Sequence, residues 1–202
     1  MTRPLTALAL TCSLKASPAR SSTELIARQV LDALASHGVS GESVRVVDHD
    51  VKPGVDPDMG DGDAWPSLRE KLMAADIFVL ATPTWMGQHS SVCMRVLERL
   101  DAELSETDGD GRLMTFGKIA VAAIVGNEDG AHRITADLFQ ALNDVGFTIP
   151  AQGVTYWNGE AMQSVDYQDL PGTPEKTASA TATLAVNAVH LAGLLRESNY
   201  PA

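Results

Sequence analysis

Hydroxyl-bearing and basic side chains gather in the segment 12–23, which reads CSLKASPARSST. The segment leads from an apolar run into a predicted helix, whose first backbone N–H groups and dipole favour an anion. Because the loop contains no glycine, it matches neither a Walker loop nor the dinucleotide fingerprint, and we expect it to hold a single terminal phosphate. Ordinary capping of the helix would use the same hydroxyls. The candidate residues are Ser13, Lys15, Ser21, Ser22 and Thr23.

A second candidate loop, ATPTWMGQHSS at 81–91, follows the most apolar run of the chain. It combines an aromatic ring and a thioether with backbone amides beside a glycine. Such a surface suits a flat heteroaromatic ligand, which needs stacking area and polar partners at its edge. The alternative is that Trp85 and Met86 are core residues under a turn.

The third candidate loop is GNEDGAH at 126–132. Its two glycines allow close approach of the backbone to a ligand. Asn127 or Asp129 could instead be the N-cap of the helix that follows.

Short apolar runs alternate with longer amphipathic ones between these loops, as expected for a mostly parallel sheet with helices on both faces. The carboxyl ends of parallel strands meet at one edge, so we expect the three loops to converge there. The predicted strands are 5–12, 43–48, 76–83, 118–126 and 148–156.

Apolar residues at helical spacing and capping signals predict five helices. The first helix runs from a cap at 21–23 to Gly38, and the second covers 67–75 after Pro66. The third runs from about Ser90 to Leu100, and the fourth from Ile134 to Val145, before Gly146. The fifth has Thr173 as its cap and Pro174 at its first helical position, and it runs to about Glu197.

The composition fits one compact domain that spans 1–202, with 45% hydrophobic residues and a net charge of -11. The basic residues do not cluster, so a nucleic-acid partner is not expected. A membrane partner is not expected either, because no run approaches the roughly 18 apolar residues of a membrane span. The N-terminal LTALALTC imitates a short lipoprotein signal, yet it serves equally well as a buried first strand.

Cys12 and Cys93 have no C-x-x-C companion, so neither a metal site nor a disulfide framework is expected. A reducing compartment, the cytoplasm, is the expected location. The acidic turns that begin at Asp56 and Glu106 do not place carboxylates as an EF-hand requires, and we interpret them as solvated loops.

Taken together, the three loops resemble those of the flavodoxin-like superfamily, and within it the group of NAD(P)H-dependent FMN reductases and quinone reductases. The resemblance spans nearly the whole chain, and TPTWMG at 82–87 is its most specific match. It implies an α/β three-layer sandwich whose five-stranded parallel sheet has the order 2-1-3-4-5. It also implies FMN as the cofactor and NAD(P)H as the co-substrate.

In that family the first loop wraps the phosphate of FMN, which corresponds to Ser13, Lys15, Ser22 and Thr23 here, with Ser21 beside them in a surface loop. This sequence departs from the family pattern with Cys12 for a common glycine, Lys15 for an arginine and the insertion ASPAR. Tyr156 and Trp157 could cover the pocket or could simply pack. The ring contacts that the resemblance implies are Pro83, Thr84, Trp85, Met86, Gly87, Asn127, Glu128, Asp129 and Gly130.

The implied activity is that of an oxidoreductase, which passes hydride from NAD(P)H to FMN and on to a quinone, a flavin or a similar small acceptor. The cofactor carries this chemistry, so no side chain need act as a nucleophile. His89 and His132 could hydrogen-bond the acceptor or the nicotinamide. The family also implies a homodimer or tetramer. A flavodoxin-type electron carrier without its own nicotinamide site, and a flavin-free scaffold or phosphate-ligand sensor, remain as alternatives.

Overall fold

The computed structural model describes residues 3–161 and 163–202. Its centre is a sheet of five parallel strands in the order β2-β1-β3-β5-β6, and β4 adds a short antiparallel pair with the end of β3. Counted along the chain without β4, this is the predicted order 2-1-3-4-5, and the flavodoxin-like fold is confirmed. The strands are β1 (Thr6–Thr11), β2 (Ser40–Arg45), β3 (Ile77–Trp85), β4 (Gln88–His89), β5 (Ile119–Gly126) and β6 (Val154–Asn158).

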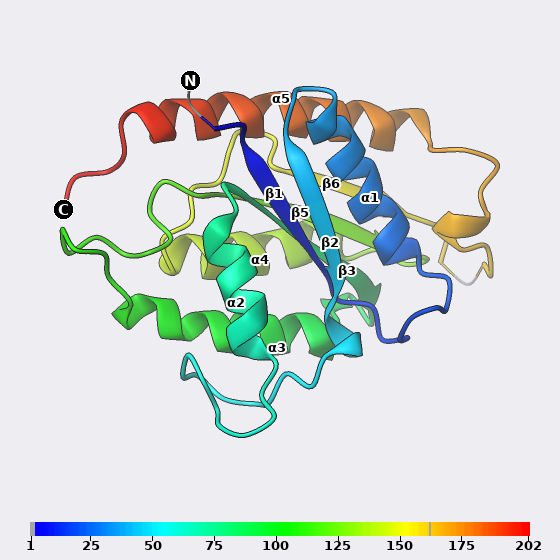
Figure 1. Ribbon diagram of the computed structural model, residues 1–202. Helices are drawn as coiled ribbons and strands as arrows, with labels where there is room; N and C mark the ends of the chain where they lie inside the picture. Colours follow the sequence, from blue (N-terminus) through cyan, green and yellow to red (C-terminus); the bar gives the residue numbers. More distant parts are fainter. Residues whose placement is uncertain (1–2, 162) are drawn as a thin grey trace.

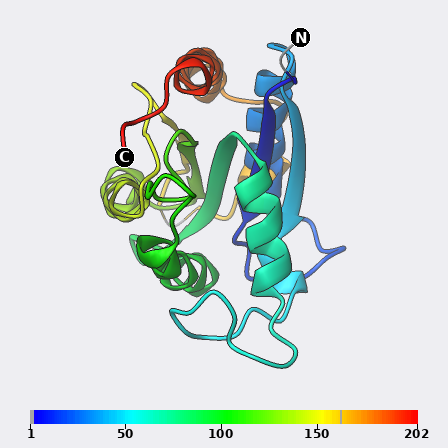
Figure 2. The same ribbon diagram turned by 60° about the vertical axis from the view of Figure 1, so that its left-hand side comes forward.

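Helices cover both faces of the sheet and complete the three layers (Figures 1 and 2). One face packs against α1 (Ser22–Ala35) and α5 (Glu175–Glu197). The other packs against α2 (Trp65–Ala74), α3 (Ser91–Leu100) and α4 (Ala131–Asp144). Three short 3-10 helices join them, namely η1 (Val46–Asp48), η2 (Asp101–Ser105) and η3 (Tyr167–Asp169).

Alternation along β1 explains how one strand serves both layers. Leu8 and Leu10 point to the face covered by α2, α3 and α4, whereas Ala7 and Ala9 point to the face of α1 and α5. Successive side chains of a strand point to opposite faces, so a strand buried on both sides reads as a continuous apolar run. The small residues on the second face let its helices pack close to the sheet.

Helix α5 is long and apolar enough to cross a membrane by length and composition. The prediction that no run approaches that length is therefore wrong for the segment 175–197. In the structure Ala185, Ala188 and Ala192 of this helix are buried in the same core cluster as the alanines of β1. One stripe of α5 thus packs in the domain core, while only 28% of its apolar window is buried.

Two predicted strands are misplaced. The segment 43–48 was expected as a strand, but β2 covers Ser40–Arg45 and residues 46–48 form η1. The polar start of β2 pairs with β1 through its backbone alone, because it lies at an edge of the sheet. The segment 148–156 begins with a single bridge at Thr148, and a turn closed by the Gly153 amide and the Pro150 carbonyl delays β6 to Val154.

The helix caps follow the prediction at two ends and differ at two. Ser21 and Ser90 cap α1 and α3, and their hydroxyl oxygens accept the amides of Glu24 and Cys93. Gly130 occupies the cap position of α4 with a φ of 136°, so neither Asn127 nor Asp129 is the cap. Pro174 is the cap residue of α5, and Thr173 instead accepts a hydrogen bond from Gln29.

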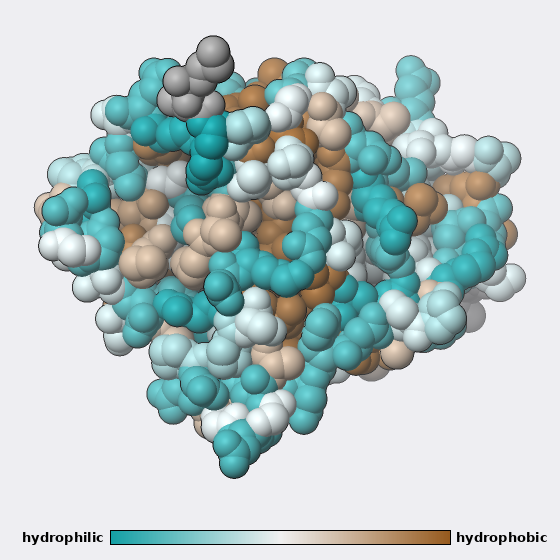
Figure 3. All heavy atoms as spheres, viewed as in Figure 1, coloured by the Kyte–Doolittle hydropathy of each residue, from teal (hydrophilic) through white to brown (hydrophobic). Residues whose placement is uncertain are grey.

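The acidic turn that begins at Asp56 is solvated as predicted, except at one residue. Asp58 and Asp61 are exposed, and hydrophilic residues spread over this face of the molecule with hydrophobic ones in strips between them (Figure 3). The side chain of Asp63, however, is fully buried and pairs with the equally buried Arg99. A buried ion pair therefore connects the turn to α3.

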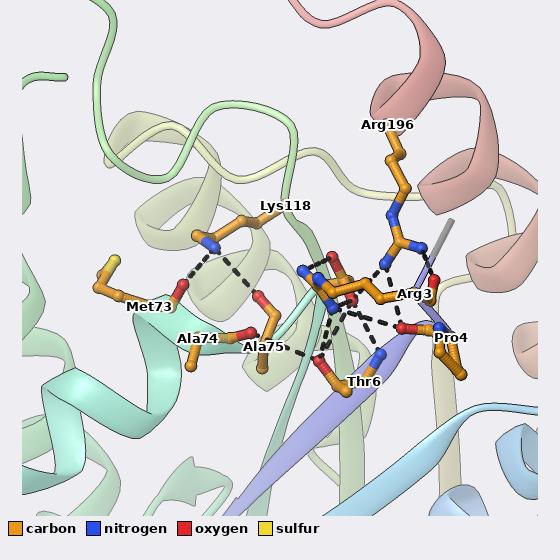
Figure 4. A network of polar contacts seen from close by, with 9 residues as sticks. Arg3, Pro4, Thr6, Met73, Ala74, Ala75, Lys118 and Arg196 are labelled. Atoms are coloured by element: carbon orange, nitrogen blue, oxygen red, sulfur yellow. Dashed lines mark hydrogen bonds and ion pairs between the residues drawn. The ribbon is translucent and has the colours of Figure 1, made fainter. Parts of the chain in front are cut away.

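A polar network that includes Arg3, Thr6 and Arg196 lies at the amino end of the sheet (Figure 4). Asp76 joins these three residues. Its carboxylate accepts hydrogen bonds from Arg3 at 2.8 Å, from Arg196 at 2.7 Å and from the Thr6 amide at 2.8 Å. Burial would raise the pKa of this carboxyl, but these hydrogen bonds outweigh it and hold the pKa below its usual value. Beside it, Lys118 Nζ donates to carbonyls at the end of α2.

Replacing Asp76 by alanine is expected to lower the free energy of unfolding by about 2 kcal/mol, because two guanidinium groups and one amide lose a charged acceptor. Urea unfolding of the variant measures this loss, with the exposed Asp101→Ala as the control. A loss no larger than that of the control would contradict the assigned role of the network.

Candidate functional site

A cavity of about 470 Å³ lies at the carboxyl edge of the sheet. Three of its walls are the loops after β1, β3 and β5, so the predicted convergence of these loops is confirmed. The fourth wall comes from residues 161 and 163–168, which follow β6. The predicted site residues that line the cavity are Ser13, Lys15, Ser21, Ser22, Thr23, Pro83, Thr84, Trp85, Asn127 and Glu128.

Two charged residues, Arg45 at the end of β2 and Asp48 in η1, hold the first loop by hydrogen bonds. Arg45 donates to the carbonyls of Lys15 and Ala19, and Asp48 accepts the amide and the hydroxyl of Ser17. Arg45 also pairs with Glu24 in the first turn of α1. Residues 16–19 of the insertion therefore lie outside the cavity wall, whereas Arg20 and the hydroxyls at the start of α1 line it.

Thr23 differs from its prediction in one respect. It was expected in a surface loop, but it lies in the first turn of α1 and is only 3% exposed. The first amides of a helix have no partner within the helix, and Ser21 takes only the amide of Glu24. This end of the cavity therefore offers hydroxyl donors, helix amides and the exposed Lys15 to an anion.

The second loop is the hairpin that joins β3 to β4. Trp85 is 56% exposed and Met86 is 90% exposed, so the alternative that both are core residues is wrong. Trp85 lines the cavity, whereas Met86 and Gly87 lie outside its wall. An exposed indole at the mouth gives the cavity a stacking surface.

The second and third loops are joined by a hydrogen bond and by a close approach of their backbones. The Met86 amide donates to Glu128 Oε1 at 2.7 Å. Met86 adopts a φ of 53°, in the left-handed region that residues other than glycine rarely occupy. A Cβ on Gly130 would lie 2.9 Å from the Cα of Gly87, so only glycine permits this approach. Like Met86 and Gly87, Gly130 supports the wall without lining the cavity. Asp129 is exposed and does not line the cavity either, so the structure does not place it where the resemblance implied.

The segment made of residues 161 and 163–168 is the part of the site that the sequence analysis missed. It carries no helical or strand periodicity, and only its position after β6 hinted at a role. Arg20 of the first loop donates to the Gln168 carbonyl at 2.8 Å and pairs with Asp169. Asn127 of the third loop donates to Asp166 at 2.9 Å. The segment thus bridges the two outer loops and covers the space between them. The further lining residues are Leu14, Arg20, Val125, Gly126, Ala161, Gln163, Asp166, Tyr167 and Gln168.

The aromatic residues of β6 pack rather than cover the cavity. The rings of Trp157 and Tyr167 lie 5.4 Å apart, and Tyr156 contacts His132, whose Nε2 lies 3.1 Å from the phenol oxygen. Neither His132 nor His89 lines the cavity. The role suggested for these two histidines stays a prediction.

Cys12, at the end of β1, is fully buried. Burial, together with the neighbouring Cys93 thiol, raises the pKa of the Cys12 thiol well above its ordinary value. The thiol therefore stays protonated, and Cys12 is a packing residue of the core.

Two polar atoms of lining residues are buried without a hydrogen-bond partner among the described residues, namely Thr84 Oγ1 and Gln168 Oε1. Buried polar atoms are almost always paired, so an unpaired one at a cavity indicates a missing partner. With an anion site at one end, a stacking surface at the mouth and these free polar atoms, the cavity suits a flat heteroaromatic phosphate.

Comparison with known proteins agrees with this geometry. Residues 6–162 match the family model described as NADPH-dependent FMN reductase. The 8-demethyl-8-aminoriboflavin-5'-phosphate synthase of Streptomyces davaonensis is 32% identical over 207 residues, which cover 97% of this chain and 80% of that protein. A crystal structure of RosB with the bound intermediate 8-demethyl-8-formylriboflavin-5'-phosphate superposes with a TM-score of 0.87 at 30% identity, over 97% of this chain and 82% of the other.

A third similarity covers only part of a longer protein. The divalent metal cation transporter MntH of Mycobacterium bovis is 38% identical over 200 residues. The match takes in 95% of this chain but only 29% of the length of that relative. The similarity therefore concerns one segment of the larger protein.

Proposed function

The chain belongs to the NADPH-dependent FMN reductase family, and on this premise we propose that it passes hydride from NADH or NADPH to bound FMN and then electrons to a quinone, a flavin or a similar small acceptor. The observation that carries the proposal is the single cavity that joins the hydroxyl-rich start of α1 to the exposed Trp85 hairpin. FMN supplies the redox chemistry when it is bound.

The residues of the cavity have separate tasks in this proposal. Lys15 and the hydroxyls at the start of α1 hold the phosphate, while Trp85 offers its face to the ring. Pro83, Thr84 and Asn127 shape the ring site, and the unpaired Thr84 and Gln168 oxygens accept hydrogen bonds from the ligand. Met86, Gly87 and Gly130 contribute by fixing the second and third loops.

Turnover of the FMN-loaded protein tests the proposal. We expect NADH or NADPH to be oxidised in the presence of a quinone or free flavin. A protein that binds FMN but oxidises neither nucleotide with any acceptor would contradict the proposed activity.

Replacement of Trp85 by alanine is expected to change the absorbance of bound FMN or the rate at which NAD(P)H reduces it, because the ring loses its stacking partner. Stability should change little, since the side chain is more than half exposed. Leu104→Ala removes an equally exposed apolar side chain from η2 and serves as the control. An unaltered spectrum together with an unaltered rate would remove Trp85 from the flavin site.

A second candidate function is that the chain consumes FMN as a substrate and modifies it. The specific observation in its favour is the similarity to a protein named as a synthase of an aminated riboflavin 5'-phosphate. Mass spectrometry of the flavin recovered after turnover separates the two functions. An unchanged mass supports the reductase, and a changed mass supports the modifying enzyme.

A homodimer or tetramer in the cytoplasm completes the proposal. The exposed Trp85 and Met86 beside the cavity support it, because large apolar side chains at a surface often mark a contact. Sedimentation analysis of the purified protein tests the oligomeric state.

A further inference from the structure

Glu128 is a carboxylate in the wall of the cavity. It follows β5, and the anion site follows β1, with β3 between them in the sheet. Neighbouring strands lie about 4.8 Å apart, so the loops that carry Glu128 and the anion site leave the sheet about 10 Å from each other. A ligand that spans the cavity would therefore meet an anion site in one loop and an anionic side chain in another.

The orientation of Glu128 is fixed by the backbone. Its Oε1 accepts the Met86 amide at 2.7 Å, and Met86 is itself held by the contact between Gly87 and Gly130. A carboxylate has two oxygens that accept hydrogen bonds and none that donates when ionised. With Oε1 engaged by Met86, the other oxygen can accept one more donor.

We propose that Glu128 is a specificity-determining residue, which accepts the ring N–H of the bound flavin and so selects a ring that carries this donor. The inference rests on the proposed function. The isoalloxazine ring of oxidised FMN has one N–H, at the imide nitrogen N3. The carboxylate would then stand between two donors, the Met86 amide and the imide.

Two donors explain why a carboxylate suits this position better than a carboxamide. A glutamine has only one acceptor oxygen. Its NH2 group would face either the Met86 amide or the imide N–H, and two hydrogen-bond donors cannot pair with each other. The negative charge has a second consequence. Reduction adds electrons to the ring, and a nearby fixed negative charge disfavours that step, so Glu128 lowers the midpoint potential of the flavin.

The first experiment is a fluorescence titration of the whole protein with FMN and with its N3-methyl analogue. The unaltered protein is expected to bind FMN at least tenfold more tightly than the analogue. Glu128→Gln should weaken FMN binding at least tenfold and abolish the discrimination. Asp129→Asn is the matched control, because it removes the same charge from an adjacent exposed residue outside the cavity wall.

The midpoint potential of bound FMN is the second readout. Glu128→Gln should raise it by about 30 mV or more, which corresponds to a tenfold change in the relative affinity for the two redox states of a two-electron couple. Asp129→Asn should leave it within a few millivolts of the unaltered protein. Asp166→Asn tests the other carboxylate of the wall, which already accepts a hydrogen bond from Asn127.

The outcomes separate the inference from the proposed function. Equal affinity of the unaltered protein for the two ligands would overturn the role of Glu128 and leave the flavin site in place, whether or not the variants fold. Loss of discrimination in Asp166→Asn but not in Glu128→Gln would also overturn it. A protein that binds no FMN at all would overturn both the inference and the proposed function.

Discussion

Replacing Lys15 by alanine is expected to weaken FMN binding about ten- to hundredfold. A hydrogen bond to a charged group contributes about 1.5–3 kcal/mol, and 1.4 kcal/mol is a factor of ten. Lys15 is exposed and lines the cavity beside the start of α1, so its side chain can be removed without disturbing the core. The loss should therefore appear in binding and not in stability.

A fluorescence titration with FMN and with riboflavin measures this effect. Riboflavin lacks the phosphate, so its weaker affinity should be the same in the variant and in the unaltered protein. Lys71→Ala, on the surface of α2 and paired with Glu42, is the matched control. An equal loss of affinity for both ligands would show that Lys15 does not contact the phosphate.

Replacing Asp63 by alanine is expected to lower the free energy of unfolding by about 3–5 kcal/mol, because it leaves a buried guanidinium without its partner. Arg99 and Asp63 are both fully buried and lie 2.7 Å apart. Asp63 also accepts the amides of Met59 and Trp65 at 2.9 and 3.1 Å. The substitution should therefore loosen the acidic turn, although Arg99 still donates to the carbonyl of Asp56 at 2.7 Å.

The same ion pair predicts how stability depends on pH. Burial would raise the pKa of Asp63, but hydrogen bonds from the Met59 amide, from Arg99 and from further amides outweigh it and lower the pKa to about 2, from a reference value of 3.8. A carboxyl whose folded-state pKa is depressed stabilises the fold above its unfolded pKa. We expect about 2 kcal/mol of stability to be lost as the pH falls from about 4 to 2.

Guanidinium chloride unfolding at pH 7, 4, 3 and 2 measures both effects. Asp61→Ala removes an exposed carboxylate from the same turn and should change stability by less than about 0.5 kcal/mol. Asp63→Asn should lose the part of the acid dependence that Asp63 contributes. Equal stability of Asp63→Ala and Asp61→Ala would contradict the role assigned to the buried pair.

Those parts of the fold that depend on local pattern were predictable from the sequence. Apolar runs and caps such as Ser21 and Ser90 placed α1 and α3, and the alternation of strands and helices indicated the sheet. The start of β2 was not predictable, because an edge strand can pair through its backbone without apolar side chains. The burial of Asp63 depends on Arg99, a partner 36 residues away, which no local pattern reveals.

The site residues were predictable where the functional side chains lie within one loop of the sequence. The hydroxyls at 21–23 line the cavity at the start of α1, and Trp85 lines it at the end of β3. Residues 161 and 163–168 were missed because their position depends on hydrogen bonds from Arg20 and Asn127, which lie in two loops distant in sequence. Sequence pattern also could not separate Met86, outside the wall, from Trp85, which lines it.

The most direct test of the proposed activity is the absorbance spectrum of the FMN-loaded protein under anaerobic conditions, before and after one equivalent of NADPH or NADH. We predict that the long-wavelength band of oxidised flavin bleaches with at least one of the two nucleotides. Bound flavin that stays oxidised with both would contradict the reductase and favour an electron carrier without a nicotinamide site.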